Sequence, residues 1–168
     1  MNILALDPGN EQTGYCIIKD TLEILEIRLI DNLELQEKIL RDDFDFPYDD
    51  AVIEMIASYG MAVGKTVFET CVWIGIFKES IENKKDRQIE VDFLYRMEEK
   101  MHICNNPKAN DSNIRVALID RFAKFDKKSG KGTKKNPDWF YGFKKDIWAS
   151  YAVAITYAEK KGEKNEKK

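Results

Sequence analysis

Two acidic residues lie in stretches of the chain that are otherwise apolar. Asp7 ends the apolar run of residues 3–6, and Glu54 interrupts the apolar run of residues 51–56. A carboxylate in a buried strand is costly unless a counter-charge neutralises it. A third acid, Asp146, stands at the front of an amphipathic helical pattern. Three carboxylates that reach one point from two strands and a helix are typical of a metal cage, so we expect these three to bind a divalent metal ion.

The same acids also admit a structural explanation, in which Asp7 caps a turn and Glu54 pairs with a buried Arg or Lys. The chemical explanation is two-metal hydrolysis of a phosphodiester, which needs several carboxylates to hold two divalent ions about 4 Å apart. Asp7, on a central strand, would bridge the ions, and Glu54, on the adjacent strand, would complete one of them. Asp146 and the residue three positions later share a helix face and would complete the other. That later position is Ala149, which offers no carboxylate.

The whole chain has the size and composition of one soluble globular domain. It has 168 residues, of which 43% are hydrophobic and 34% charged. We expect a single domain over residues 1–160 and a disordered charged tail over residues 161–168. No stretch has the length of a membrane span, and the N-terminus lacks a signal region, so we expect a cytoplasmic protein with no membrane partner.

Cysteine and histidine usage argues against several other kinds of site. Cys16, Cys71 and Cys104 are widely spaced and form no CxxC pattern. We therefore expect reduced core residues, not zinc ligands. The only histidine is His102, and nothing near it in the sequence suggests a catalytic triad or a histidine-rich metal site.

The net charge of −3 conceals two segments of opposite sign. Residues 20–50 carry eleven acids against three bases, a net charge of −8. Residues 121–145 carry nine bases against two acids, a net charge of +7, and include a loop of glycines and lysines at 127–137. A polyanion responds to the local face that it approaches, so the basic loop is a candidate surface for a phosphate backbone. The alternative is an ordinary solvated loop.

Residue patterns predict an α/β domain with a mixed sheet whose first three strands are antiparallel. The expected strands cover residues 2–7, 14–18, 22–30, 51–56 and 88–95. The expected helices cover residues 33–40, 65–83, 96–103, 113–124 (capped by Asp111 or Ser112) and 143–159.

The helix expected at residues 65–83 is apolar around most of its circumference. A helix that packs on one face does not need this pattern. Either the helix is deeply buried, or one side meets the sheet and the other meets a partner subunit. We expect the second arrangement, with a homodimer interface formed by Phe68, Val72, Trp73 and Ile76.

The residues resemble those of the RuvC-like Holliday-junction resolvases, most closely the small versions carried by bacteriophages of Gram-positive hosts. The resemblance lies in ILALDPG at residues 3–9, TGY at 13–15, IE at 53–54 before a glycine-containing linker and a long helix, and DIWASYAVA at 146–154. No single piece is decisive, but their order and spacing together are fairly specific.

This resemblance implies an RNase H-like fold with a mixed five-stranded sheet flanked by helices. It also implies a homodimer that cuts four-way DNA junctions symmetrically, using two Mg²⁺ ions per site or Mn²⁺ in their place. Asp7, Glu54 and Asp146 are then catalytic metal ligands, and a fourth acid is expected where this chain has Ala149. The expected DNA contacts, chosen from charge and resemblance, are Lys65, Lys108, Lys127, Lys128, Lys131, Lys134 and Lys135.

Ala149 either belongs to a naturally weakened site or replaces an aspartate to silence a nuclease, and we favour replacement. We therefore expect a chain that folds, dimerises and binds junctions but cleaves them poorly. Three other functions remain open: a non-catalytic branched-DNA-binding protein, an actin-like or sugar-kinase-like ATPase, and an RNase H-type enzyme for RNA–DNA hybrids. The ATPase would need two similar domains, and 168 residues supply one.

Overall fold

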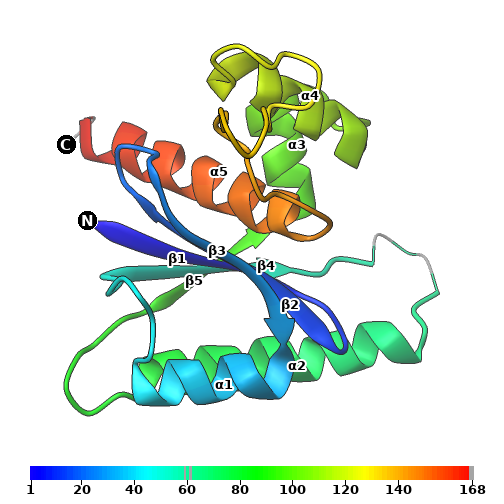
Figure 1. The fold of residues 1–168 in the computed structure, drawn as a ribbon. Helices are drawn as coiled ribbons and strands as arrows, with labels where there is room; N and C mark the ends of the chain where they lie inside the picture. Colours follow the sequence, from blue (N-terminus) through cyan, green and yellow to red (C-terminus); the bar gives the residue numbers. More distant parts are fainter. Residues whose placement is uncertain (59, 61, 167–168) are drawn as a thin grey trace.

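A mixed five-stranded sheet, ordered β3-β2-β1-β4-β5, lies at the centre of the computed structural model, which describes residues 1–58, 60 and 62–166 (Figure 1). Its strands are β1 (Asn2–Pro8), β2 (Gln12–Lys19), β3 (Ile24–Asp31), β4 (Asp50–Met55) and β5 (Val91–Tyr95). Strand β2 is antiparallel to both β1 and β3, whereas β4 is parallel to both β1 and β5. The predicted strand arrangement is therefore confirmed.

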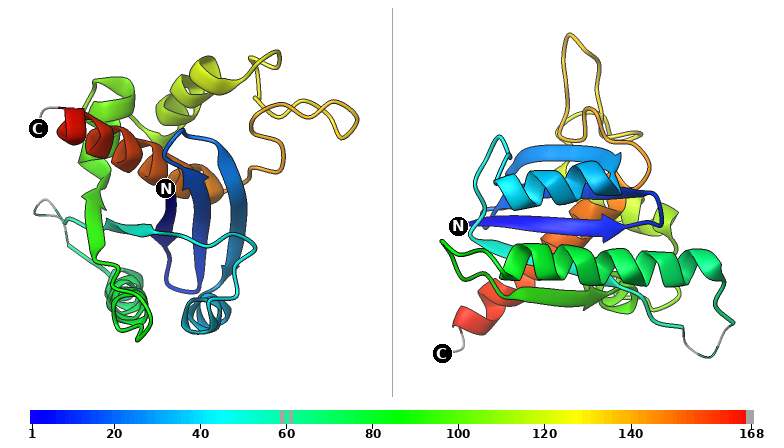
Figure 2. Two further views of the ribbon diagram at one scale, coloured as in Figure 1. Left: turned by 90° about the vertical axis from the view of Figure 1, so that its left-hand side faces the viewer. Right: turned by 90° about the horizontal axis from the view of Figure 1, so that it is seen from below.

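Five helices cover the two faces of the sheet. They are α1 (Asn32–Arg41), α2 (Lys65–Glu82), α3 (Arg96–Cys104), α4 (Asp111–Phe122) and α5 (Ile147–Glu166). Helices α1 and α2 lie side by side on one face, and α5 crosses the other face with α3 and α4 beyond it (Figures 1 and 2). Within the described residues, no helix is both long enough and apolar enough to cross a membrane.

The sheet separates two hydrophobic layers, and the alternation of β1 assigns its side chains to them. Ile3 and Ala5 pack toward α5, whereas Leu4 and Leu6 pack toward α1 and α2. Successive side chains of a strand point to opposite faces, so Asp7 belongs to the α5 side. Apolar side chains cover both faces of β1. This explains why its apolar residues form a continuous run and do not alternate with polar ones.

The last helix extends further than the sequence pattern predicted. Residues 161–166, expected to belong to a disordered tail, continue α5, while residues 167 and 168 lie outside the described part. Lys and Glu residues favour a helix in this segment. Ion pairs of Lys160 and Lys161 also hold this part of α5 against the rest of the domain. Lys160 binds Glu98, and Lys161 Nζ lies 2.5 Å from Asp50 Oδ2.

Several smaller expectations were wrong at element ends: α5 begins at Ile147 and not at residue 143, and β3 begins at Ile24 and not at residue 22. The side chain of Asn110, not that of Asp111 or Ser112, caps α4 by accepting a hydrogen bond from the Asn113 N–H, and Asn113 returns the contact to the Asn110 N–H. The last strand begins at Val91, three residues after the expected start at residue 88.

Helix α2 is buried along one side only. Its buried residues are Thr70, Ile74, Phe77, Ser80 and Ile81. Phe68 and Val72 are 61% and 60% exposed, and Trp73 and Ile76 are half-buried at the border of the exposed side. Cys71, expected in the core with Cys16 and Cys104, is exposed because it shares this outer face. Helix α2 therefore carries apolar side chains on its outer face as well as on the face that packs against the sheet.

An aromatic cluster joins the segment before α5 to α4 and α5. Phe140 is fully buried, with its ring centroid 4.6 Å from that of Trp148 and 5.0 Å from that of Phe143. Phe122 and Tyr151 complete the cluster in edge-to-face contacts. Such pairs add to the stability that burial of the rings provides.

We predict that Phe140→Ala lowers the free energy of unfolding by about 3–5 kcal/mol, because it leaves a cavity in this cluster. Urea denaturation followed by circular dichroism would measure the change. Tyr141→Ala is the matched control, since the neighbouring ring is 47% exposed; we expect a change within about 0.5 kcal/mol. Equal effects of the two substitutions would contradict the cluster's role.

Candidate active site

Asp7 and Glu54 lie next to each other at the carboxyl ends of two parallel central strands. The register of β1 and β4 pairs Leu6 with Ile53, so the next residues on the two strands are the two acids. Val52 packs on the α5 side of the sheet, and alternation places Glu54 on that side with Asp7. The two carboxyl groups are hydrogen-bonded to each other.

A glycine on the neighbouring strand allows Asp146 to join this pair. Gly14 is the antiparallel partner of Asp7 on β2. A Cβ at Gly14 would lie 2.5 Å from the carbonyl oxygen of Asp146 and 3.2 Å from its Cβ, so the backbone before α5 approaches β2 as closely as a glycine permits. The three acids predicted from the sequence are therefore brought together by β1, β4 and the start of α5.

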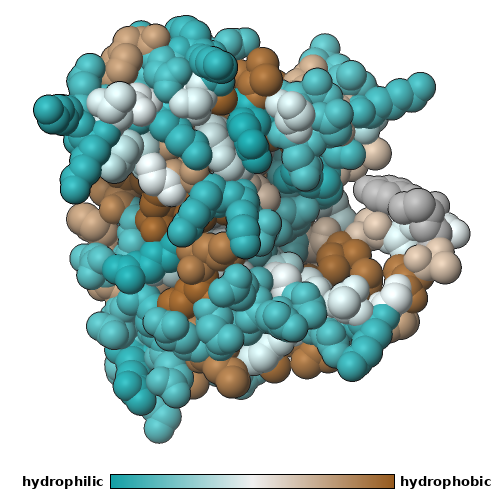
Figure 3. All heavy atoms as spheres, turned by 45° about the vertical axis from the view of Figure 1, so that its right-hand side comes forward, coloured by the Kyte–Doolittle hydropathy of each residue, from teal (hydrophilic) through white to brown (hydrophobic). Residues whose placement is uncertain are grey.

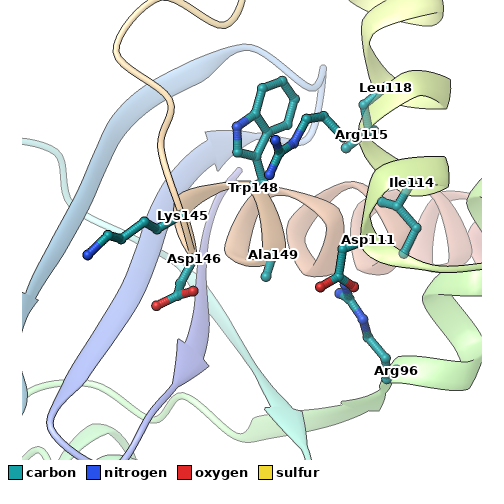
Figure 4. Close-up of a pocket in the computed structure, with 9 residues that line it drawn as sticks. All are labelled: Arg96, Asp111, Ile114, Arg115, Leu118, Lys145, Asp146, Trp148 and Ala149. Carbon is teal, nitrogen blue, oxygen red and sulfur yellow. The ribbon is translucent and has the colours of Figure 1, made fainter.

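Ala149 lies one turn into α5 on the same side of the helix as Asp146. Together they line a small cavity of about 60 Å³ (Figure 4). Asp111, on α4, faces Ala149 across this cavity, and Lys145 and Arg115 lie at its border. Position 149 therefore faces the cavity beside Asp146, where the sequence predicted that an acid would contribute.

Two residues of α3 belong to this acidic cluster and were not identified from the sequence. Arg96 Nη1 lies 2.6 Å from Glu99 Oε2 and 4.0 Å from Glu54 Oε2, and Arg96 also binds Asp111. The alternative that Glu54 pairs with a buried base is thus realised in part, at the limit of an ion pair. The available signal was an Arg and a Glu three positions apart, directly after the strand that pairs with β4.

Burial and mutual repulsion disfavour the charged forms of these carboxyl groups. Burial raises the pKa of Asp7 well above 3.8, and Glu54, Asp146 and Glu99 raise it further by their negative charges. Burial also raises the pKa of Glu54, although Arg96 opposes the shift. Burial, followed by repulsion from Glu54, raises the pKa of Glu99 to about 9. A cation in this cluster would relieve both penalties.

The donor chemistry of the cluster fits a hard divalent cation. Carboxylate oxygens are the ligands that Mg²⁺ and Mn²⁺ prefer, and Asp7 and Glu54 present them side by side. The side chains, as they stand, do not enclose an ion: in the part of the chain that the structure describes, no three His, Cys, Asp or Glu residues form a closed set of ligands. The present arrangement instead places a guanidinium and a shared hydrogen bond between the acids.

The basic loop expected to contact phosphate is held in shape by two aspartates. Asp126 accepts hydrogen bonds from the backbone N–H groups of residues 128, 129, 131 and 132, and Asp138 accepts from those of residues 124, 125, 126 and 139. Gly130, at a φ of +70°, packs against Phe140, where a Cβ would lie 2.6 Å from the ring. The two acids of this segment therefore serve the loop. Of its lysines, Lys128, Lys134 and Lys135 are exposed, Lys131 is half-buried, and Lys127 Nζ donates to the carbonyl oxygens of Asp120 and Ala123 at the end of α4.

The lysines predicted to contact DNA do not form one compact patch. Lys127, Lys128, Lys131, Lys134 and Lys135 belong to the loop after α4, and Lys108 is exposed between α3 and α4. Lys65 begins α2 on the other side of the sheet and pairs with Glu69 at 3.3 Å. The bases that line the cavity beside Asp146 are Arg96, Arg115 and Lys145, which sequence reasoning did not single out. In Figure 3, hydrophilic side chains cover most of the face shown, and hydrophobic patches interrupt them, chiefly at its middle and right.

Two solved structures share this arrangement of strands and helices. One is described as T. thermophilus RuvC in complex with Holliday junction substrate, with a TM-score of 0.62, 12% sequence identity, and coverage of 94% of this chain and 93% of that chain. The other is the Thermus thermophilus RuvC structure, with a TM-score of 0.61, 12% identity and the same coverage. The fold is that of RuvC. The RNase H-like class predicted from the sequence is therefore confirmed.

The likeness to RuvC lies in the fold and not in the overall sequence. No family model and no curated protein sequence matches the chain. At 12% identity, the shared features are the order and packing of the elements over almost the full length of both chains. The roles of individual residues must therefore be argued from the site itself.

We predict that Asp7→Asn stabilises the metal-free protein at pH 8 by about 1–3 kcal/mol, because it removes a carboxyl group whose ionisation burial opposes. A raised folded-state pKa means that the folded protein binds more protons than the unfolded chain, so this group's contribution falls as the pH rises above 3.8. The stability difference from wild type should therefore shrink toward pH 4. Thermal denaturation in EDTA at several pH values would measure it.

Asp120→Asn provides the control, since this aspartate is exposed on α4. It should leave the pH dependence of the melting temperature unchanged. An Asp7→Asn protein that tracks the wild type at every pH would contradict the buried, proton-sharing pair.

Proposed function

We propose that the chain is a metal-dependent, structure-specific endodeoxyribonuclease that binds four-way or branched DNA junctions and cleaves them symmetrically. The observation that carries this proposal is the meeting of Asp7, Glu54 and Asp146 on one side of a RuvC-like sheet. Half-buried acids that face each other on adjacent central strands reduce stability in the absence of a cation, which favours a functional explanation over a structural one. One of the similar solved structures is described as a complex with a Holliday junction substrate.

The proposed cofactor is Mg²⁺, two ions per site, with Mn²⁺ as a substitute. Asp7, on β1 between β2 and β4, would hold these ions together with Glu54 and Asp146. Bound ions would supply an ionised water nucleophile and stabilise the departing 3′-oxygen. The protein's own part is to fix these carboxylates on strands and a helix packed in the core.

Ala149 leaves this site one acid short of the set implied by the resemblance. The side of α5 that carries Asp146 offers a methyl group at position 149, where a carboxylate would reach the same cavity. We propose that the chain binds junctions but hydrolyses them slowly for this reason. Replacement of an aspartate at this position to silence the nuclease would explain how the rest of the cluster is retained.

The proposed DNA surface combines the ordered basic loop with bases near the acids. The loop lysines carry positive charge without base-reading chemistry, which suits recognition of backbone and shape. Lys65 and Lys108 remain proposed contacts at greater distance from the loop. Arg115 and Lys145 border the cavity beside Asp146 and add positive charge where a scissile phosphate would lie.

A homodimer is proposed because two symmetric cuts require two related active sites. One metal site cuts one strand, and a two-fold dimer matches the symmetry of a four-way junction. Phe68 and Val72 are exposed on α2, and Trp73 and Ile76 border a hollow with Asn10 and Glu11. Exposed apolar side chains grouped in this way favour a protein partner.

The quoted residues resemble phage-encoded resolvases of Gram-positive hosts, and we propose that origin for the chain. A DNA substrate of this kind would place its activity in the cytoplasm of the host cell.

We predict that Ala149→Asp increases the rate of junction cleavage by about 100-fold or more, since a further carboxylate would complete the ligands of the second ion. The assay is cleavage of a labelled synthetic four-way junction with Mg²⁺ and with Mn²⁺, alongside an electrophoretic measure of junction binding. Both forms should bind the junction with similar affinity. Equal cleavage rates would show that position 149 has no part in catalysis.

Other outcomes of the same assay identify the alternatives. Junction binding without cleavage by either form would identify a binding module, and cleavage of an RNA–DNA hybrid in preference to the junction would identify an RNase H-type enzyme. ATP binding by calorimetry would identify the kinase-like alternative. Each of these results would contradict the proposed function.

We predict that Val72→Glu shifts the protein from dimer to monomer in sedimentation velocity, because it places a charge in the middle of the proposed apolar interface. Val116→Glu is the matched control: it makes the same substitution at a valine that is 53% exposed on α4. A dimer that persists in Val72→Glu, or a monomeric wild type, would contradict the interface on α2.

A further inference from the structure

Glu99 is a fully buried carboxylate to which the proposed two-metal site assigns no role. Its Oε2 accepts a hydrogen bond from Arg96 Nη1 at 2.6 Å. Its Oε1 is also buried and has no hydrogen-bond partner among the residues that the structure describes. A buried carboxylate oxygen without a donor is costly, and native structures retain such groups chiefly where they bind something.

The connection from β5 to α3 places Glu99 beside the strand that carries Glu54. Leu94 on β5 pairs with Glu54 on β4, and α3 begins directly after β5. Arg96 Nη1, which binds Glu99, lies 4.0 Å from Glu54 Oε2. Glu99 and Glu54 therefore face the same guanidinium nitrogen, and Glu54 in turn is hydrogen-bonded to Asp7.

The charges of this inner cluster do not balance within the protein. Glu99 is buried, Asp7 and Glu54 are half-buried, and the guanidinium of Arg96 contacts Glu99 and Glu54 and supplies one positive charge. When all three are ionised, they leave an excess of two negative charges, which equals the charge of one divalent cation. Arg96 is also shared with the exposed Asp111, so its charge is not reserved for Glu99.

We propose that Glu99 is a further carboxylate ligand of the divalent cation, held in place by Arg96 until the cation binds. This inference rests on the proposed metal-dependent function and adds to it a ligand from α3. It also gives the site an acid that the side of α5 lacks at Ala149. The unpartnered Oε1 is the atom available to the cation, since Arg96 binds the other oxygen.

Calorimetric titration of the full-length chain with Mn²⁺ tests the proposal without using activity. We expect Glu99→Gln to weaken Mn²⁺ affinity about tenfold or more, because it removes an anionic ligand while keeping an acceptor for Arg96. Glu98→Gln is the matched control on the same helix: Glu98 pairs with Lys160 and accepts from the Tyr95 N–H, and glutamine preserves that cap. It should bind Mn²⁺ as the wild type does.

Asp7→Asn separates failure of this inference from failure of the proposed metal site. If Asp7→Asn loses Mn²⁺ binding but Glu99→Gln retains wild-type affinity, Glu99 is not a ligand and the metal site stands. If Asp7→Asn and Glu99→Gln both bind Mn²⁺ like the wild type, the metal site on β1 and β4 is wrong and this inference falls with it.

A second measurement distinguishes lost metal binding from a change in the stability of a variant. The rise in melting temperature on adding Mn²⁺ is compared with the value in EDTA for each variant, so that altered metal-free stability cancels. Glu99→Asp keeps the charge on a shorter side chain and should also show a reduced rise. A rise equal to that of the wild type in Glu99→Asp and Glu99→Gln would overturn the proposal.

Discussion

The hydrogen bond between Asp7 and Glu54 joins two carboxyl groups at the centre of the sheet, where one of them must keep a proton or a cation must approach. The surrounding structure is arranged around this charge. Gly14 leaves room for Asp146, Arg96 reaches toward Glu54 from α3, and the apolar layers exclude water from most of the pair's surroundings. Each of the two acids follows four consecutive buried residues of its strand, so the acids cannot move far apart to relieve their repulsion.

The sheet and the central acids were predictable because they depend on local sequence. The apolar runs of β1 and β4 identify buried strands, and an acid at the end of each run is visible in the sequence itself. Asp146 could be added because it precedes an amphipathic helix. The close approach of that helix to β2 could not be predicted from the sequence. It depends on the absence of a side chain at Gly14, which is far from Asp146 in the chain.

The missed residues depend on contacts between distant elements. Glu99 and Arg96 were not singled out on their short helix, and only the position of β5 beside β4 brings them to Glu54. The end of α5 was underestimated for the same reason, because Lys160 and Lys161 are held by Glu98 and Asp50 from other parts of the fold. Cys71 was misplaced because an apolar helix pattern does not say which side meets the sheet.

The loop after α4 shows how acids can support a basic surface. Asp126 and Asp138 bind its backbone N–H groups, and the Ser129 hydroxyl together with those N–H groups holds the pKa of Asp126 below its ordinary value. The loop's conformation is therefore determined during folding, before any polyanion arrives. Its lysines would lose only side-chain freedom on contact with phosphate, so less of the binding energy is spent on ordering the backbone. A polyanion that bound here would then have to adapt its own shape to that of the loop.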